Sequence, residues 1–269
     1  MTTPSYIAAT DGTKLAFYAT PAREGRVGPG IVFLGGFMSD MTGEKATTLE
    51  AWAQRTGHAY LRLDYSGHGY SGGKFRDGTV GRWVHDALDV IEHAGNTVAG
   101  LGGPLILVGS SMGGWIMVLV ALALQKAAAL QQASGLVGIA SAPDFTHDLM
   151  PEQLGPEVMA HIAQEGFYSA LSEYSDEPYI ITQDLIEDGN RQLVLGKPLA
   201  LDVPVRLIHG TADLDVPWTR SQKLMEVLTS DDVELLLVKD GDHRLSSERD
   251  LVRLAAVVER LAASLAEIS

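Results

Sequence analysis

The chain of 269 residues contains no cysteine. Disulfide bonds, thiolate metal ligands and a cysteine nucleophile are therefore all excluded. Basic residues are also scarce, because 20 lysines and arginines stand against 34 aspartates and glutamates, which gives a net charge of −14. Nucleic acids and anionic membranes are bound through clustered basic side chains, so this balance argues against both as main partners.

Long hydrophobic runs are missing as well. The longest, residues 115–124, is about half as long as the roughly 20 residues that a membrane-spanning helix needs, so a buried helix is expected there and no membrane span. The N-terminal residues lack the basic start and apolar core of a signal peptide, which predicts a cytoplasmic protein.

Short apolar runs alternate with helical patterns along most of the chain. Residues 6–9 and 14–19 predict a hairpin, because Asp11-Gly12 lies between them. Further strands are expected at 31–34, 58–64, 104–109, 135–140, 205–209 and 233–239, and helices at 40–56, 79–95, 112–130, 217–229 and from 247 onward. This alternation predicts an α/β fold with a mostly parallel sheet covered by helices on both faces.

The alternation stops between residues 144 and 200. This stretch has four prolines and amphipathic pieces at 153–163 and 178–185, but no clear buried strand. We therefore expect a helical cap over the strand ends, inserted into a single domain that spans residues 1–269. Its apolar side chains could line an acyl pocket or only pack the cap onto the sheet; they include Leu154, Val158, Met159, Phe167 and Tyr168.

A serine stands at the centre of the pattern Gly109-x-Ser111-x-Gly113, between an apolar strand and an apolar helix. On so sharp a turn, only glycines two residues before and after the serine leave room for the crossing backbone. The turn would hold the hydroxyl above the sheet edge, with the helix N-terminus facing any oxyanion formed there. Ser110 lacks this pair of glycines, so Ser111 is the candidate nucleophile.

A serine hydroxyl becomes a good nucleophile when a neighbouring base, itself oriented by a carboxylate, accepts its proton. Candidates follow the last two predicted strands, because Asp213 comes after 205–209 and His243 after 233–239. Parallel strands end at the same edge of a sheet, so both side chains can meet Ser111 there. The chain order Ser, Asp, His is that of α/β-hydrolases.

Two other titratable residues near these positions have plainer interpretations. Asp215 is an alternative to Asp213, but its place shortly before Pro217 favours a helix cap. His209 ends a buried strand, where a hydrogen-bonded core histidine is expected. No group of His, Asp and Glu has metal-ligand spacing on one element, so no metal is expected.

Several motifs together resemble the α/β-hydrolase superfamily over nearly the whole chain. They are Gly35-Gly36-Phe37, residues 64–69, the turn at 109–113, residues 213–217, and Asp242-His243. Residues 109–115, 216–218 and 242–244 are similar, more closely, to the subfamily of α/β-hydrolase domain-containing protein ten. That subfamily includes a mitochondrial serine esterase acting on acyl glucuronides and S-palmitoyl thioesters.

The resemblance implies a role for each matching residue. Ser111 would be the nucleophile, His243 the general base and then acid, and Asp213 the orienting carboxylate. The backbone amides of Phe37 and Met112 would form the oxyanion hole. The implied reaction is hydrolysis of a small-molecule acyl ester or thioester through an acyl-enzyme, without a cofactor.

Other uses of the same side chains stay open at this point. One is a perhydrolase, an acyltransferase or a carbon–carbon bond hydrolase with the same triad. Another is a ligand-binding protein with slow turnover. The fold alone does not choose among them, because it hosts many chemistries. The sequence leaves the oligomeric state open.

Overall fold

The computed structural model describes residues 3–127, 131–170 and 179–268. Within them an eight-stranded sheet forms the centre of the molecule. In spatial order its strands are β1 (Ser5–Ala8), β2 (Lys14–Thr20), β4 (Tyr60–Leu63), β3 (Gly30–Leu34), β5 (Leu105–Ser110), β6 (Ala133–Ile139), β9 (Val205–Gly210) and β10 (Val233–Val238). The pairs β1–β2 and β2–β4 are antiparallel and the remaining neighbours are parallel, which confirms the predicted sheet.

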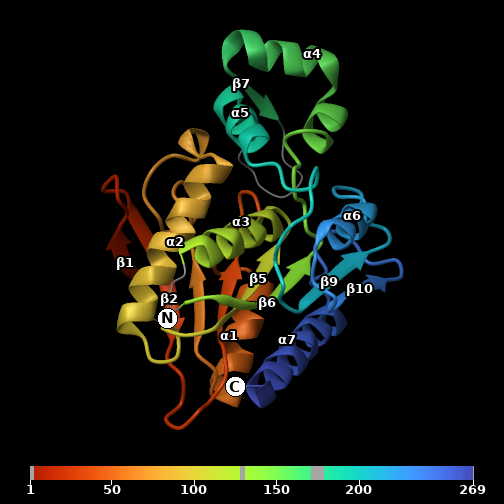
Figure 1. Cartoon of the computed structure of the whole chain (residues 1–269). Coiled ribbons are helices and arrows are strands. Elements are labelled where there is room, and N and C mark those ends of the chain that lie inside the picture. The colour runs from red at the N-terminus through yellow and green to blue at the C-terminus, as the bar shows by residue number, and fades with distance from the viewer. Residues whose placement is uncertain (1–2, 128–130, 171–178, 269) are drawn as a thin grey trace.

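Helices cover both faces of this sheet (Figure 1). Helices α2 (Val80–Thr97) and α3 (Met112–Ala127) pack on one face, and α1 (Glu44–Thr56) and α7 (Glu248–Ile268) on the other. Successive strand residues point to opposite faces, so Val32 and Leu107 join the first apolar cluster and Ile106 joins the second. This burial on both faces explains why the inner strands read as continuous apolar runs.

Two shorter helices lie at the edges of this arrangement. The 3-10 helix η1 (Phe75–Asp77) precedes α2, and α6 (Thr219–Val227) connects β9 to β10. The predicted helix boundaries differ from the observed ones at α1, which begins at Glu44 with Gly43 at its N-cap rather than near residue 40. Asp40 instead accepts a hydrogen bond from the backbone N–H of Thr42 at 2.6 Å and so closes a separate turn. The expected end of α3 at residue 130 lies outside the described residues.

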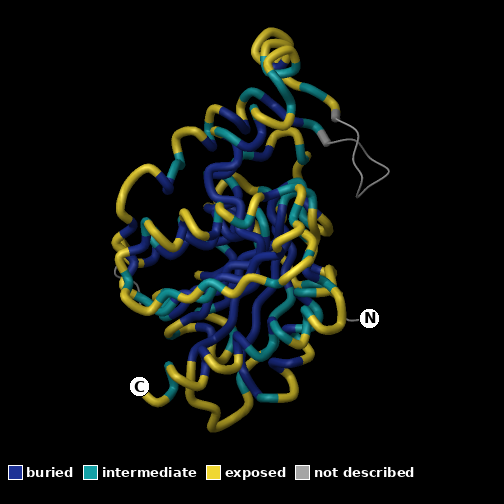
Figure 2. The backbone as a smooth tube through the Cα atoms, turned by 90° about the vertical axis from the view of Figure 1, so that its right-hand side faces the viewer, coloured by how far each residue is buried: buried dark blue, intermediate teal, exposed yellow. Residues whose placement is uncertain are grey.

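The chain leaves the sheet between β6 and β9. This insertion (144–170 and 179–200) contains α4 (Leu149–Glu165), β7 (Phe167–Ala170), β8 (Tyr179–Thr182) and α5 (Gln183–Arg191). Figures 1 and 2 show that it stands above the sheet, with an exposed outer helix. The sequence indicated only helices here, but β7 and β8 pair as an antiparallel hairpin. Residues 179–182, expected to be an amphipathic helical piece, are therefore a strand.

Polar contacts join the two ends of the insertion to each other and fasten it to the rest of the molecule. The buried Asp144 carboxylate accepts hydrogen bonds from the backbone N–H groups of Val194 and Leu195, both at 2.8 Å. Arg220 of α6 makes two hydrogen bonds of 2.8 Å to Asp148, the residue that caps α4. Such two-point pairs fix geometry as well as charge, so the start of α4 has a defined position over the sheet.

Candidate active site

The turn between β5 and α3 requires its glycines. An added Cβ at Gly109 would lie 2.2 Å from the carbonyl oxygen of Gly113, and one at Gly113 would lie 2.1 Å from that of Leu34. Ser111 has a φ of 57°, a left-handed conformation that non-glycine residues seldom adopt. The backbone N–H of Ser111 donates to the carbonyl of Ile139 at 2.8 Å. The crowded turn thus lifts Ser111 out of the strand.

The structure brings the three predicted side chains together. Nε2 of His243 lies 3.0 Å from Oγ of Ser111, and Nδ1 of His243 lies 2.8 Å from Oδ2 of Asp213. A carboxylate oxygen can only accept, so Nδ1 carries the proton and Nε2 is the acceptor for the serine hydroxyl. This is the tautomer needed for His243 to take a proton from Ser111.

Asp213 is the acceptor for four donors. Its Oδ1 accepts from the backbone N–H groups of Asp215 (3.0 Å) and Val216 (2.8 Å), and its Oδ2 accepts from His243 and from Nε2 of His209 at 3.1 Å. Burial alone would raise the pKa of Asp213. The hydrogen bonds from His209, His243 and Val216 outweigh burial and hold that pKa well below its usual range. The carboxylate therefore stays charged beside His243.

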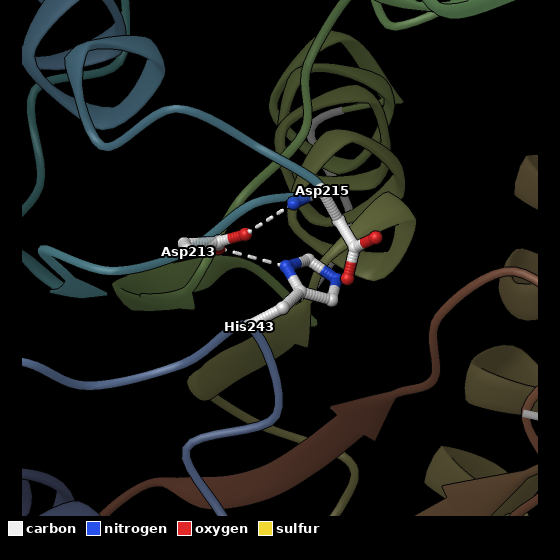
Figure 3. Close-up of side chains that lie close together, drawn as sticks. All are labelled: Asp213, Asp215 and His243. Atoms are coloured by element: carbon white, nitrogen blue, oxygen red, sulfur yellow. Dashed lines mark hydrogen bonds and ion pairs between the residues drawn. The ribbon is translucent and has the colours of Figure 1, made fainter. Parts of the chain in front are cut away.

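Asp215 is not the helix cap that its position before Pro217 suggested, because α6 begins at Thr219 with Trp218 at its N-cap. Its carboxylate instead lies beside the ring of His243 (Figure 3). Asp213 is the carboxylate hydrogen-bonded to that ring, and Asp215 lines the adjoining pocket.

Asp213, Asp215 and His243 each offer one ligand atom within 4.8 Å of the others, the spacing at which a metal ion could bind. Hydrogen bonds already occupy both oxygens of Asp213 and Nδ1 of His243, so a cation would have to displace them. That no metal is used remains a prediction.

Phe37 and Met112 both border the pocket above Ser111. An added Cβ at Gly36 would lie 3.3 Å from the Cβ of Ser111, so the chain just before Phe37 passes directly over the serine. The ring of Phe37 packs edge-on against Phe75, with 4.8 Å between centroids. Met112 is the first residue of α3, next to Ser111. Both backbones are thus close to the serine hydroxyl.

The pocket holds about 450 Å³ and lies between the strand ends and the insertion. Its wall on the insertion side is apolar, with Phe145, Leu149, Met150, Leu154 and Ile181. The lining from outside the insertion includes the charged residues Asp40, Glu44, Lys45 and Arg244. Ser111 and His243 line the same pocket, which therefore offers a substrate both apolar surface and charged groups.

The insertion residues that the sequence offered as acyl-pocket candidates fall into two groups. Leu154 lines the pocket. Val158, Met159 and Tyr168 instead pack against the apolar core, and Phe167 is exposed. Of this set, only Leu154 is placed to contact a substrate in the pocket.

Three polar residues that sequence reasoning did not assign to the site support it. His209, expected as a hydrogen-bonded core histidine, is buried and bonded as expected, but one of its partners is Asp213. Lys45 donates to the carbonyl of Arg244 at 2.5 Å and so ties α1 to the loop of His243, while burial lowers the pKa of its ammonium group. Gln153 of α4 donates to the carbonyl of Asp215 at 2.8 Å.

Of these three, only His209 had a signal in the sequence, because it stands four residues before Asp213 at the end of a strand. Lys45 and Gln153 lie far along the chain from their partners. The contacts of Lys45 with Arg244 and of Gln153 with Asp215 form only when distant segments of the folded chain meet.

Comparisons with known proteins show the family to which the chain belongs. The profile of the family described as "Serine aminopeptidase, S33" matches residues 30–185. The chain therefore belongs to this α/β-hydrolase family, as the sequence motifs predicted. Among the described residues, no helix has both the length and the hydropathy needed to cross a bilayer.

More specific relatives match nearly the whole chain. It is 35% identical to the mitochondrial palmitoyl-protein thioesterase ABHD10 of Bos taurus, over 99% of this chain and 82% of the bovine protein. The mouse α/β hydrolase domain-containing protein 10 superposes with a TM-score of 0.83 at 33% identity, covering 98% of this chain and 100% of that one. A protein from Agrobacterium vitis S4 reaches a TM-score of 0.89 at 41% identity, with 97% and 98% covered. The predicted subfamily resemblance is confirmed.

Proposed function

We propose that this protein is a serine hydrolase that cleaves carboxylic esters or thioesters of apolar acyl groups through an acyl-enzyme. The observation that carries the proposal is the continuous chain of hydrogen bonds from Ser111 through His243 to Asp213, which opens onto a pocket with one apolar wall. The homologous thioesterases support the same class of substrate.

In the first half of the reaction, Oγ of Ser111 attacks the acyl carbonyl while Nε2 of His243 takes its proton. Asp213 stabilises the imidazolium that forms, and it keeps the ring in the required tautomer. The backbone amides of Phe37 and Met112 donate to the oxyanion of the tetrahedral intermediate. Two such donors act on charge that exists only near the transition state, which is why they accelerate the reaction.

Acylation is complete when His243 gives its proton to the leaving alkoxide or thiolate, and the acyl group stays on Ser111. Water then enters, His243 takes one of its protons, and the resulting hydroxide attacks the acyl-enzyme. Collapse of the second tetrahedral intermediate releases the carboxylic acid and returns the proton to Ser111. The insertion acts as a cap whose apolar wall holds the acyl chain during both steps.

Labelling with a fluorophosphonate tests the nucleophile. Intact-mass spectrometry followed by peptide mapping should find one adduct, on Ser111. Ser111→Ala should abolish the adduct and lower ester and thioester hydrolysis by about 10⁴- to 10⁶-fold, while the neighbouring Ser110→Ala should keep both. Wild-type hydrolysis by Ser111→Ala would refute the mechanism.

A substrate series then separates the possible acyl acceptors. Esters and thioesters of increasing chain length should be hydrolysed, with the apolar wall favouring longer acyl groups. Preferential transfer to peroxide or to an alcohol, or cleavage of a β-diketone, would contradict simple hydrolysis. Tight binding with turnover far below about 1 per second would instead indicate a ligand-binding protein. The cytoplasmic location remains a prediction, and the bovine relative named above is described as mitochondrial.

A further inference from the structure

His209 is a second histidine on the carboxylate of Asp213. It lies near the end of β9, its side chain is completely buried, and Asp213 follows it by four residues. Its Nε2 lies 3.1 Å from Oδ2 of Asp213, the same oxygen that accepts from His243 at 2.8 Å. One carboxylate oxygen is thus shared by two imidazole rings.

The partners of His209 fix where its proton is. Nε2 also faces the carbonyl oxygen of Val216 at 2.9 Å, and neither that oxygen nor the Asp213 carboxylate can donate. Nε2 therefore carries the proton, and Nδ1 accepts from the hydroxyl of Ser221, 2.7 Å away. A buried ring with both nitrogens bonded has one orientation, so it presents a fixed N–H to Asp213.

We propose that His209 is a positioning residue of the hydrolase: it holds the Asp213 carboxylate in line with His243 and draws part of its negative charge away from that ring. The proposal rests on the function argued above, because it assigns no chemistry to His209 itself. Without this N–H, Oδ2 would interact with the imidazolium of His243 alone and more strongly. Because the undivided charge of Asp213 then favours the imidazolium over the neutral ring that accepts from Ser111, activity would be lost earlier on acidification.

The acid limb, meaning the part of the pH profile in which activity falls on acidification, depends on every charge around Asp213 and His243. Among the described residues, the other titratable or charged groups here are Asp215 on the pocket side, Asp40, Glu44 and Lys45 at and before the start of α1, and Asp242 and Arg244 beside His243 in the chain. A substitution at His209 leaves all of them in place. A change in the acid limb would therefore report on the contact of His209 with Asp213.

Two amide substitutions of similar polarity separate positioning from packing. The side chain of His209→Gln can extend an N–H to the place of Nε2, whereas His209→Asn reaches only the place of Nδ1. Both are compared with the wild-type chain by thermal unfolding and by kcat and KM for one ester across pH about 5 to 9.

We expect His209→Asn to lower kcat about 10- to 100-fold with little change in KM, by analogy with the loss of outer hydrogen-bond partners around metal-ligating histidines. The pH of half-maximal activity on the acid side should rise by roughly half a unit. His209→Gln should restore most of kcat and the wild-type acid limb.

Wild-type kinetics in a folded His209→Asn, or equal losses in both variants with an unmoved acid limb, would overturn the proposal. If neither variant folds, Ser221→Ala keeps His209 but removes the hydroxyl that fixes its ring through Nδ1, so its N–H is held less firmly against Asp213. It should lower kcat severalfold with a shift in the same direction, and a wild-type profile there would also overturn the proposal. Failure of the proposed function itself would appear separately, as absent fluorophosphonate labelling of Ser111 in the wild-type chain.

Discussion

Asp213 is at once a part of the candidate site and the residue that shapes its own loop. Through Oδ1 it accepts the N–H groups of Asp215 and Val216, which folds the loop after β9 back on itself. Through Oδ2 it accepts from two histidines. A single substitution there therefore removes both a structural acceptor and the partner of His243.

The two neighbouring carboxylates can be told apart by matched substitutions. Asp213→Asn places an amide N–H₂ or a weaker acceptor where His243 needs a charged one, so kcat should fall about 10⁴-fold. Asp215→Asn changes a side chain that lies beside His243 but does not hold its Nδ1, and should cost less than about tenfold. Steady-state kinetics at pH 8 measures both. A larger loss for Asp215→Asn than for Asp213→Asn would show that Asp215 is the orienting acid.

Sequence patterns predicted Ser111, Asp213 and His243, and in the structure His243 is hydrogen-bonded to each of the other two. Ser111 follows from the glycines around it, and Asp213 and His243 follow from their place after parallel strands. The patterns were wrong about Asp215 as a helix cap, because the carboxylate of Asp213 had already organised that loop. They could not indicate Lys45, since its contact with Arg244 joins residues far apart in sequence.

At the scale of elements, burial decided what could be predicted. The inner strands were recognisable because both of their faces are apolar, and α2 and α7 because each has one apolar stripe. The β7–β8 hairpin was missed because it pairs only with itself and lies above the sheet, where period-two burial is weak. Its sequence therefore resembles that of the amphipathic helices around it.

The loop after β4 is held by a buried acid that the reaction does not use. Asp64 accepts hydrogen bonds from the backbone N–H groups of Met41 at 2.7 Å and Tyr70 at 2.8 Å, and its side chain leaves no space for a Cβ at Gly69. Burial raises the pKa of Asp64 to about 6 despite these donors. Asp64 therefore holds a proton more tightly in the folded chain than in the unfolded chain.

This shift predicts how stability changes with pH. The contribution of Asp64 is complete below its ordinary pKa of 3.8 and is lost as pH rises through about 6. The free energy of unfolding of the wild-type chain should lose about 2 kcal/mol from this group between pH 4 and 7, at 1.36 kcal/mol per pKa unit, because a part is already lost at pH 4. Urea unfolding of wild type and Asp64→Asn at both pH values measures the difference.

Asp64→Asn should not show this loss of unfolding free energy, so the variant should become more stable relative to wild type as pH rises. Asp77→Asn, at an exposed position on the neighbouring 3-10 helix, is the control and should leave the wild-type profile unchanged. A constant difference between Asp64→Asn and wild type across this range would contradict the assignment.

At the scale of the whole molecule, the pocket belongs to neither the sheet nor the insertion alone. The strand ends supply Ser111 and His243, and the insertion supplies the apolar wall. The link between them is polar: Gln153 reaches the carbonyl of Asp215, and Asp148 at the start of α4 pairs with Arg220 of α6. How the acyl wall is placed over the serine therefore depends on contacts remote from the chemistry.

Removing that link should alter substrate choice more than reactivity. Arg220→Met keeps the side-chain length but breaks both hydrogen bonds to Asp148, so Leu149, Met150 and Leu154 should be held less firmly over the pocket. KM for a long-chain ester should rise about three- to tenfold, the equivalent of one partly buried two-point ion pair. kcat/KM for an acetyl ester, which does not reach that wall, should stay within about twofold.

Arg191→Met is the matched control, because it removes a pair with Asp188 within α5 and leaves α4 anchored. An equal loss on both esters would mean that the pair stabilises the fold as a whole and does not set acyl preference.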